Sequence, residues 1–326
     1  MLKLVVKLLL FALLIGASMQ AMFVGARRLE TLYYEDSSYA WVNRLPVKPK
    51  IVMLGSSTML INLSSREVCA KLDLKDGEVI NIGGSDRGSI DMYHFWNTIA
   101  KNRDSVQIVL MTVDPWIAYQ SYDWRQRFPT LYWSPWQRVY AIADSGFPRS
   151  VLSGMIVTEV VKKSVRQLLH TSIPNINTPV DYGSELMPLH VKKSTAHTRA
   201  YFGETTVYPV SELYISRMAM LKRSVEQQGA KFILVLPPKQ KIWLDEYQSE
   251  CSTLDSEFIS HLNAALGPTR VIGSFGQFSA SGDSTLFIDY VHLGSEGQRR
   301  FSDSIAGHLP EVLASQPKYL NSLSSY

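Results

Sequence analysis

Ile51-Val52-Met53-Leu54-Gly55-Ser56-Ser57 opens the folded part of this 326-residue chain with four apolar residues and a glycine–serine stop. An unbroken apolar run of this length is typical of a strand buried on both faces of a parallel sheet. Four more runs of this kind follow, at residues 79–82, 106–113, 232–236 and 269–272. The sequence therefore predicts five strands.

Helix-like patterns lie between these runs, at residues 64 onward, 90–101, 213–228, 258–266 and 295–313. Ser64 is a suitable N-cap, and Glu67 three residues later completes the pattern of a capping box. Gly229 is a suitable helix end, and Pro310 predicts a break in the closing helix. Strands that alternate with helices predict an α/β fold, here a flavodoxin-like three-layer sandwich around a mainly parallel five-stranded sheet.

Composition restricts the class of protein. Hydrophobic residues make up 46% and charged residues 19% of the chain, as expected for a globular protein with a membrane-associated part. The net charge of +4 is too small to indicate a nucleic-acid partner, and no basic run is interleaved with aromatic residues. Cys69 and Cys251 lack metal-ligand spacing, and either one disulfide or two buried thiols fits them. No metal or organic cofactor is expected.

The N-terminal 28 residues are predicted to form a membrane anchor or a signal segment. An apolar run over residues 8–25 is flanked by Lys3 and Lys7 before it and by Arg27 and Arg28 after it. About 18 to 20 apolar residues suffice to span a bilayer as a helix. The run is long for a signal peptide and its cleavage pattern is poor, which favours an uncleaved anchor. The balanced flanking charges leave the orientation open.

A polar connector over residues 29–49 leads into the predicted α/β domain, residues 50–326. Residues 115–205 interrupt the alternation of strands and helices and are predicted to be one long insertion. Nine Trp, Tyr and Phe residues crowd into the 25 residues from Trp116 to Tyr140. Such a cluster fits glycan stacking, the core of a lid, or a membrane interface. Residues 151–169 follow as an amphipathic helix that packs on its own domain or lies on lipid.

Three segments point to one site at the carboxyl edge of the predicted sheet, where ligands bind in open parallel sheets. Ser57 follows the first strand, Gly83-Gly84-Ser85-Asp86 follows the second, and Asp289-Tyr290-Val291-His292 lies between the fifth strand and the closing helix. A serine hydroxyl becomes a nucleophile when a base removes its proton. His292 is the candidate base, and Asp289 would fix its tautomer. Each motif alone also fits a turn, a cap or simple packing.

This arrangement resembles the SGNH (GDSL-like) hydrolase superfamily, with Ser57 at the nucleophile position and Asp289-x-x-His292 as the acid/base block. Ser56 stands where the family usually has Asp, as in a membrane-anchored subset related to the teichoic-acid D-alanylation protein and the alginate O-acetylation proteins. His292-Leu293-Gly294 also resembles that subset. The resemblance covers residues 51–113 and 211–313. It implies acyl-ester transfer to a polysaccharide and a multi-pass membrane acyltransferase as partner.

The oxyanion side of the site departs from the family pattern. Asp86 falls where the family has Gly, so the backbone N–H groups of Ser57 and of Gly84 or Asp86 are the candidate donors. The family's Gly-x-Asn-Asp block after the third strand is replaced by Val113-Asp114-Pro115-Trp116. Asp114 and Trp116 are substrate-binding candidates, although Asp114 also fits a cap of the turn at Pro115.

The leading hypothesis is an anchored serine acyl-ester transferase at the inner or cytoplasmic membrane, facing the periplasm or the exterior. Its substrate would be a cell-surface or secreted polysaccharide. Two alternatives stay open: a simple carbohydrate esterase or deacetylase, and a catalytically silent glycan-binding or scaffold protein of a polysaccharide export system. The missing third block favours the silent protein.

Overall fold

A computed structural model describes residues 48–84, 92–93, 95–97, 105–114, 212–241, 243–244, 254–278 and 284–314, and within the N-terminal run residues 3, 5–11, 13–14, 16–18 and 21. The chain divides into two compact units, residues 1–44 with 124–180 and residues 45–123 with 181–326. The sheet and the helices below belong to the second unit. The described residues of the first unit are helical.

Five parallel strands form one sheet in the order β2-β1-β3-β4-β5. Their bounds are β1 Ile51–Leu54, β2 Val79–Asn81, β3 Ile108–Thr112, β4 Lys231–Leu236 and β5 Arg270–Gly273. Ile51 pairs with Val79 on one side and with Ile108 on the other, which fixes β1 between β2 and β3. The α/β prediction with five parallel strands is therefore confirmed, with ends that differ from the predicted runs by up to two residues.

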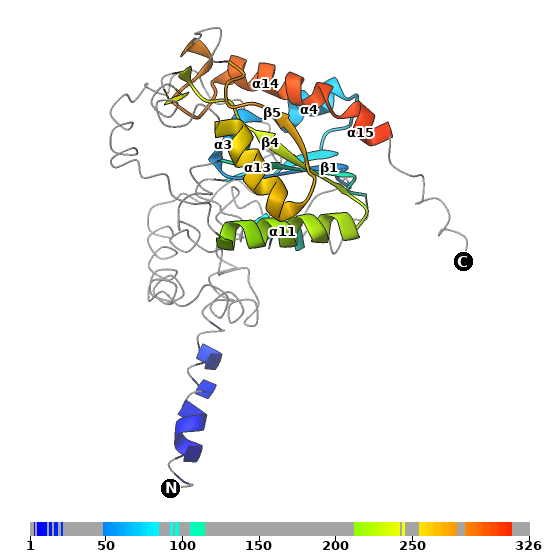
Figure 1. Cartoon of the computed structure of the whole chain (residues 1–326). Coiled ribbons are helices and arrows are strands. Elements are labelled where there is room, and N and C mark those ends of the chain that lie inside the picture. The colour runs from blue at the N-terminus through cyan, green and yellow to red at the C-terminus, as the bar shows by residue number, and fades with distance from the viewer. Residues whose placement is uncertain are drawn as a thin grey trace, which may run out of the picture. The chain divides into compact units, whose positions relative to one another are not determined.

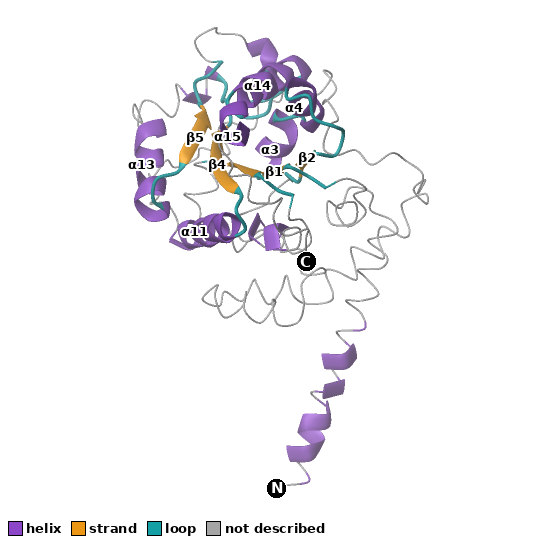
Figure 2. Cartoon of the chain, turned by 90° about the vertical axis from the view of Figure 1, so that its right-hand side faces the viewer, coloured by secondary structure: helices purple, strands orange, loops and turns teal. Residues whose placement is uncertain are grey.

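Helices cover both faces of this sheet, as Figures 1 and 2 show. One face carries α4 Ser65–Lys71, α14 Ser295–Gly307 and α15 Pro310–Ala314, and the other carries α11 Glu212–Gln227 and α13 Leu254–Leu266. Alternate strand residues such as Ile51 and Met53 share a buried cluster with Phe301 and Ile305 of α14. Every residue of β1 and β3 is buried, because covered parallel strands turn apolar side chains to both faces.

Of two helix-end patterns in the sequence, the capping box at Ser64 forms in part and the break before Pro310 forms as predicted. The Glu67 N–H donates to Ser64 Oγ at 3.3 Å, but the Ser64 N–H donates to Ser302 Oγ at 2.9 Å. Only half of the predicted capping box forms, because a packed helix supplies the second partner. The closing helix does break: α14 ends at Gly307 and α15 begins at Pro310, where a missing N–H costs nothing.

Three other predicted helices agree with the structure in place but not in their bounds, because α11 spans residues 212–227 and not 213–228, α13 begins earlier, and the helix at 90–101 is described only in part. Gly229, with φ of +78°, follows α11 as predicted, and α13 begins four residues before the predicted residue 258. Residues 92–93 and 95–97 are helical within the predicted helix 90–101, and the rest of that helix lies outside the described residues. The insertion at 115–205, including the aromatic cluster and the 151–169 helix, also lies outside them.

No helix among the described residues has the length and apolarity needed to cross a membrane. The anchor over residues 1–28 therefore stays a prediction.

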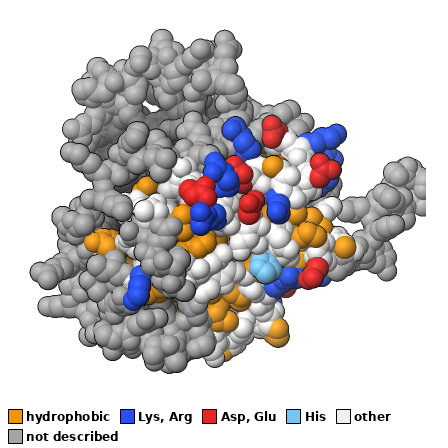
Figure 3. Space-filling model, turned by 90° about the horizontal axis from the view of Figure 1, so that it is seen from above, with side chains coloured by type: hydrophobic (Ala, Val, Ile, Leu, Met, Phe, Trp, Pro, Cys, Tyr) orange, Lys and Arg blue, Asp and Glu red, His pale blue; other side chains and the backbone are white. Residues whose placement is uncertain are grey.

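The solvent face of α14 carries side chains of both signs close together, as the view from above shows (Figure 3). The two Glu296 carboxylate oxygens lie 2.8 Å from Arg299 Nη1 and from Arg300 Nε, and Arg299 Nε lies 3.9 Å from Glu67 Oε1 of α4. Exposed pairs of this kind contribute little to stability individually. They mark the polar face of a helix whose opposite face enters the core.

Candidate active site

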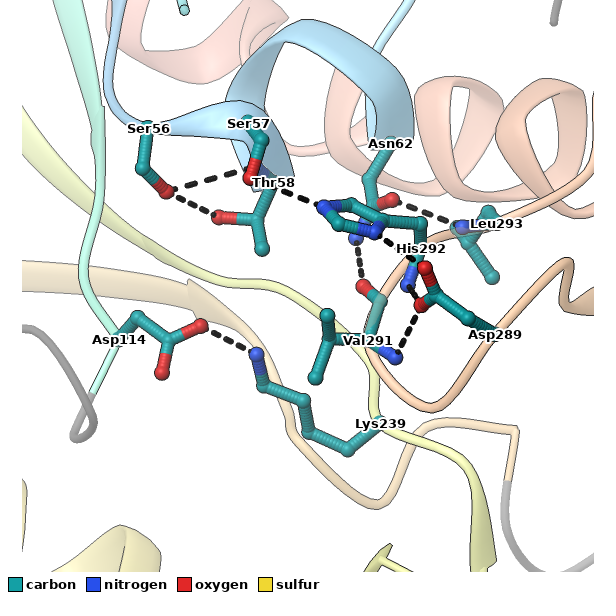
Figure 4. A network of polar contacts seen from close by, with 10 residues as sticks. All are labelled: Ser56, Ser57, Thr58, Asn62, Asp114, Lys239, Asp289, Val291, His292 and Leu293. Carbon is teal, nitrogen blue, oxygen red and sulfur yellow. Dashed lines mark hydrogen bonds and ion pairs between the residues drawn. The ribbon is translucent and has the colours of Figure 1, made fainter. Parts of the chain in front are cut away.

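The polar residues at the carboxyl edge of the sheet come from the ends of three neighbouring strands and from one loop (Figure 4). Ser56 and Ser57 follow β1, Asp114 follows β3, and Lys239 follows β4. The loop from Asp289 to His292 leads into α14. β1 and β3 are neighbours in the sheet, and they lie where the strand order reverses direction, which is the usual ligand position in such folds.

Ser57 is the first residue of a short helix, α3, Ser57–Asn62, which the sequence did not predict. Ser56 is its N-cap, and the Ser56 Oγ accepts from the Thr58 N–H at 3.4 Å. Ser and Asp are both good N-caps, so Ser56 fills the same local role that an Asp would fill at this position. With only six residues, α3 is too short to give a readable helical period.

Gly55 makes the turn between β1 and α3 possible. A Cβ on Gly55 would lie 2.0 Å from Thr112 Oγ1 and 2.6 Å from the Met59 Cβ. No side chain fits in that space. The backbone of the turn therefore lies directly against β3, which fixes the position of Ser57 relative to the end of the sheet.

Ser57, His292 and Asp289 form a continuous hydrogen-bonded row (Figure 4). His292 Nε2 lies 2.9 Å from Ser57 Oγ, and His292 Nδ1 lies 2.7 Å from Asp289 Oδ2. An ionised carboxylate only accepts, so in the neutral imidazole Nδ1 carries the ring proton and Nε2 turns a lone pair to the serine hydroxyl. The structure thus brings together the three side chains that the sequence predicted, in the geometry of a nucleophile, base and orienting carboxylate.

Asp289 is held as a carboxylate by three hydrogen bonds, two from backbone N–H groups and one with the His292 ring. Its Oδ1 accepts from the Val291 N–H at 2.9 Å and from the His292 N–H at 2.8 Å, while Oδ2 faces the His292 ring. Partial burial by itself raises the pKa of Asp289, but the hydrogen bond and charge of His292, together with the two backbone N–H groups, lower it below its usual value. The carboxylate therefore stays ionised where the imidazole needs it.

The loop that carries Asp289 and His292 closes on itself. The Ile288 N–H donates to the His292 carbonyl at 3.0 Å, and the Gly294 N–H donates to the Leu286 carbonyl at 2.8 Å. The Gln240 N–H, just after Lys239, donates to the Tyr290 carbonyl at 2.9 Å. The strand-end segment after β4 thus helps to position the loop.

Asn62, the last residue of α3, holds the same loop from the other side. Its Nδ2 donates to the Val291 carbonyl at 2.9 Å, and its Oδ1 accepts from the Leu293 N–H at 2.9 Å. The residue is completely buried. Sequence reasoning missed Asn62 because its partners are more than 200 residues away and nothing in its neighbourhood distinguishes it from an ordinary helix end.

Asn81, the last residue of β2, fixes the C-terminal part of α3. Its Nδ2 donates to the carbonyls of Met59 and Leu63 at 2.9 and 2.8 Å, and its Oδ1 accepts from the Gly83 N–H at 2.9 Å. A Cβ on Gly83 would lie 2.4 Å from the Leu60 nitrogen. Asn81 and Gly83 therefore hold the helix that carries Ser57.

Two of the three candidate oxyanion donors lie within the described residues, and one of them, the Ser57 N–H, belongs to the first residue of α3. The Gly84 N–H donates to the Gly55 carbonyl at 3.2 Å. In this conformation the Gly84 N–H is used by the backbone, and its role as an oxyanion donor stays a prediction. Asp86 lies outside the described residues.

Asp114 forms a buried ion pair with Lys239, which the sequence did not single out (Figure 4). The Lys239 side chain is 0% exposed and that of Asp114 is 7% exposed. The Lys239 ammonium also lies 5.5 Å from the Trp243 ring centroid. In the described conformation Asp114 is therefore the ion-pair partner of Lys239. Trp116, the other substrate-binding candidate, lies outside the described residues.

No group of three or more His, Cys, Asp and Glu side chains that could hold a metal ion occurs within the described ranges. Cys69 is a buried free thiol, and its Sγ lies 3.4 Å from the Lys75 carbonyl oxygen. Burial, together with the negative charges of Asp76 and Glu78, raises the pKa of this thiol. Cys251 lies outside the described residues.

Comparison with protein-family models finds no match, and comparison with curated proteins finds no significant relative. The case for a function therefore depends on the chemistry of the row Ser57, His292 and Asp289 and on the resemblance carried by the motifs around it.

Proposed function

We propose that this chain is a serine acyl-ester transferase or esterase of the SGNH-like kind, anchored in a membrane, that acts on a cell-surface or secreted polysaccharide. The observation that carries the proposal is the 2.9 Å contact between Ser57 Oγ and His292 Nε2, with Asp289 on the far side of the ring. A serine, a base and an orienting carboxylate within hydrogen-bond reach are what acyl transfer requires.

The first half-reaction forms an acyl-enzyme. Ser57 Oγ attacks the carbonyl carbon of an acyl ester while its proton passes to His292 Nε2. The imidazolium that results is stabilised by the Asp289 carboxylate. The tetrahedral oxyanion collapses, the bond to the leaving alcohol breaks, and His292 returns its proton to that alcohol. Acyl-Ser57 and a free alcohol are the products.

The second half-reaction releases the acyl group. A sugar hydroxyl or water gives its proton to His292 and attacks the acyl-Ser57 carbonyl. Collapse of the second tetrahedral intermediate breaks the bond to Ser57 Oγ, which recovers its proton from His292. A sugar acceptor yields transfer, and water yields hydrolysis. The resemblance to anchored acylation proteins favours transfer and a multi-pass membrane acyltransferase as partner.

The Ser57 N–H is the proposed oxyanion donor that the described residues supply. A second donor would come from outside them, with the backbone N–H of Asp86 as the sequence-based candidate. Losing one donor costs on the order of 10²- to 10³-fold in rate. A slow enzyme with a well-formed acid/base pair is therefore the expected behaviour if the second donor is absent.

The strand order β2-β1-β3-β4-β5 supports the finer assignment to a flavodoxin-like three-layer sandwich. Localisation is part of the same proposal. The apolar run over residues 8–25 would place the domain at the inner or cytoplasmic membrane, facing the periplasm or the exterior.

The test uses the full-length chain purified in detergent and incubated with an aryl acetate, with and without an oligosaccharide acceptor. Transfer predicts acetylated oligosaccharide and release that rises with acceptor concentration, both lost in S57A. Fast release that ignores the acceptor identifies an esterase instead. No Ser57-dependent reaction, together with an unchanged cellular phenotype of S57A, contradicts an enzyme and favours the silent binding protein.

A further inference from the structure

The short helix α3 joins the candidate nucleophile to the loop of the candidate base. Its first residue is Ser57, and its last is Asn62. Asn62 contacts not the His292 side chain but the two peptide groups that flank it, the Val291 carbonyl and the Leu293 N–H, each at 2.9 Å. One rigid turn and a half of helix therefore connects both sides of the Ser57–His292 contact.

Both ends of this connection are fixed. At the nucleophile end, Gly55 packs directly against β3 with no space for a Cβ. At the other end, Asn81 donates to the carbonyls of Met59 and Leu63. The helix is thus tied to the sheet independently of the His292 loop, and Asn62 transmits that position to the loop.

The chemistry of the contact requires an asparagine. One carboxamide donor binds a carbonyl and one carboxamide acceptor binds an N–H, and the Asn62 side chain is completely buried. A buried peptide group that loses its partner seeks another, because an unpaired buried polar group is costly. Leucine keeps the approximate size of the side chain and loses both bonds. Aspartate keeps the shape but, when ionised, turns an acceptor to the Val291 carbonyl.

We infer that Asn62 is a positioning residue, which holds His292 Nε2 within hydrogen-bond reach of Ser57 Oγ by clamping the peptide groups on both sides of His292. This inference rests on the proposed function of Ser57 and His292. Asn62 touches no reacting atom in the described structure. Its effect is on the distance and direction between nucleophile and base.

A displacement of about 1 Å between reacting groups can cost on the order of 10²-fold in rate. We therefore expect N62L to lower kcat for an aryl acetate by about 10²-fold with KM little changed, since the substrate contacts stay in place. The rate at which a fluorophosphonate labels Ser57 should fall in parallel, because labelling depends on the same base.

N62D gives a second, pH-dependent readout. Burial raises the pKa of a carboxyl introduced at this position, and its neutral form can donate to the Val291 carbonyl as the amide does. The ratio of N62D to wild-type labelling rate should therefore rise as the pH is lowered. Protonation of His292 lowers both rates and largely cancels in the ratio. A residue needed only for packing would give a ratio that does not change with pH.

The matched control is N97L. Asn97 also loses a side-chain hydrogen bond on substitution, since its Oδ1 accepts from Ser224 Oγ at 3.3 Å, but that contact lies on α11. We expect N97L to keep the wild-type labelling rate even where it lowers the unfolding temperature as much as N62L does. If N62L does not fold, N62D, which keeps the size of the side chain, takes its place.

Crystals of the full-length variants test the positioning without any reaction. The Ser57 Oγ to His292 Nε2 distance is 2.9 Å in the wild-type chain and should exceed hydrogen-bond reach in N62L. A variant that keeps this distance and the wild-type labelling rate overturns the inference. Absence of Ser57-dependent labelling in the wild-type chain overturns the proposed function instead, and the crystallographic distance still decides the role of Asn62.

Discussion

Replacing Asp289 with asparagine should reverse the tautomer of His292. Asp289 Oδ1 accepts from two backbone N–H groups, those of Val291 and His292, at 2.9 and 2.8 Å. The asparagine oxygen must take that position, because the amide NH2 would otherwise face two donors. The NH2 group is then directed at His292 Nδ1, which becomes an acceptor. The ring proton moves to Nε2, where it faces Ser57 and prevents proton removal.

The size of the effect follows from the same contacts. Turning the amide over would lose two hydrogen bonds, each contributing about 0.5–1.5 kcal/mol, so the inactive tautomer is favoured by about 2 kcal/mol, roughly 30-fold. Loss of the negative charge opposite the imidazolium adds to this, and the same change in a Ser-His-Asp triad lowers kcat about 10⁴-fold. We expect D289N to lose between about 10² and 10⁴ in kcat.

The assay is aryl acetate turnover by the full-length chain in detergent, with thermal unfolding measured on the same samples. D303N is the matched control, since Asp303 is an exposed carboxylate on α14. It should keep wild-type turnover. Turnover of D289N within about threefold of wild type, in a chain whose S57A variant is inactive, would refute the tautomer argument.

Three further predictions concern the scaffold around the row. K239M leaves the buried Asp114 carboxylate without its ammonium partner and should lower the free energy of unfolding in urea by about 3–5 kcal/mol. The double variant D114N/K239M should recover much of that loss. Equal stability of the single and double variants would contradict this expectation. G55A introduces a Cβ 2.0 Å from the Thr112 hydroxyl of β3 and should lower the free energy of unfolding by about 1–3 kcal/mol in the same assay. Turnover should also fall. An unchanged unfolding curve would show that the turn relaxes without cost. The pKa of Asp289 is lowered on folding, so its contribution to stability is present above its unfolded pKa of about 3.9 and disappears as the pH falls through the folded pKa. The free energy of unfolding in urea should therefore fall less between pH 6 and pH 2 in D289N than in wild type. Parallel pH dependences of the two proteins would contradict the lowered pKa.

The sequence predicted the strands well because covered parallel strands are marked by unbroken apolar runs. β1 and, in β4, the five residues after the exposed Lys231 are buried, and their unbroken apolar sequences indicate it directly. Predicting α3 was harder, since six residues between a glycine turn and Ser64 are too few for a period of 3.6 to appear. The helix that presents Ser57 therefore emerged only from the structure.

The three side chains of the candidate triad could be predicted because the chemistry requires specific residue types. Asp289 and His292 are three residues apart, and chain order with the sheet pattern brought Ser57 to the same edge. Asn62 and Lys239 carry no such local signal. Asn62 contacts a loop 229 and 231 residues away, and Lys239 meets Asp114 at a separation of 125 residues. Contacts of this kind depend on how separate strand ends come together.

The Gly84 N–H shows why backbone donors of a site are hard to predict from sequence. A glycine-rich loop after a strand indicates available backbone donors, but the pairing of a particular N–H depends on the exact path of the turn. Here the Gly55 carbonyl takes it at 3.2 Å. Backbone groups near a close approach are commonly used by the fold itself, so oxyanion donors are less predictable from sequence than side-chain catalysts.

Trapping of the acyl-enzyme tests the central claim most directly. The full-length chain is mixed with an aryl acetate, quenched in acid within the first turnover, digested and mapped by mass spectrometry. Our account predicts one acetyl group per chain on the peptide that contains Ser57, absent in S57A and strongly reduced when His292 is replaced by alanine. Acetylation spread over other residues, or label on Ser57 that does not depend on His292, would contradict it.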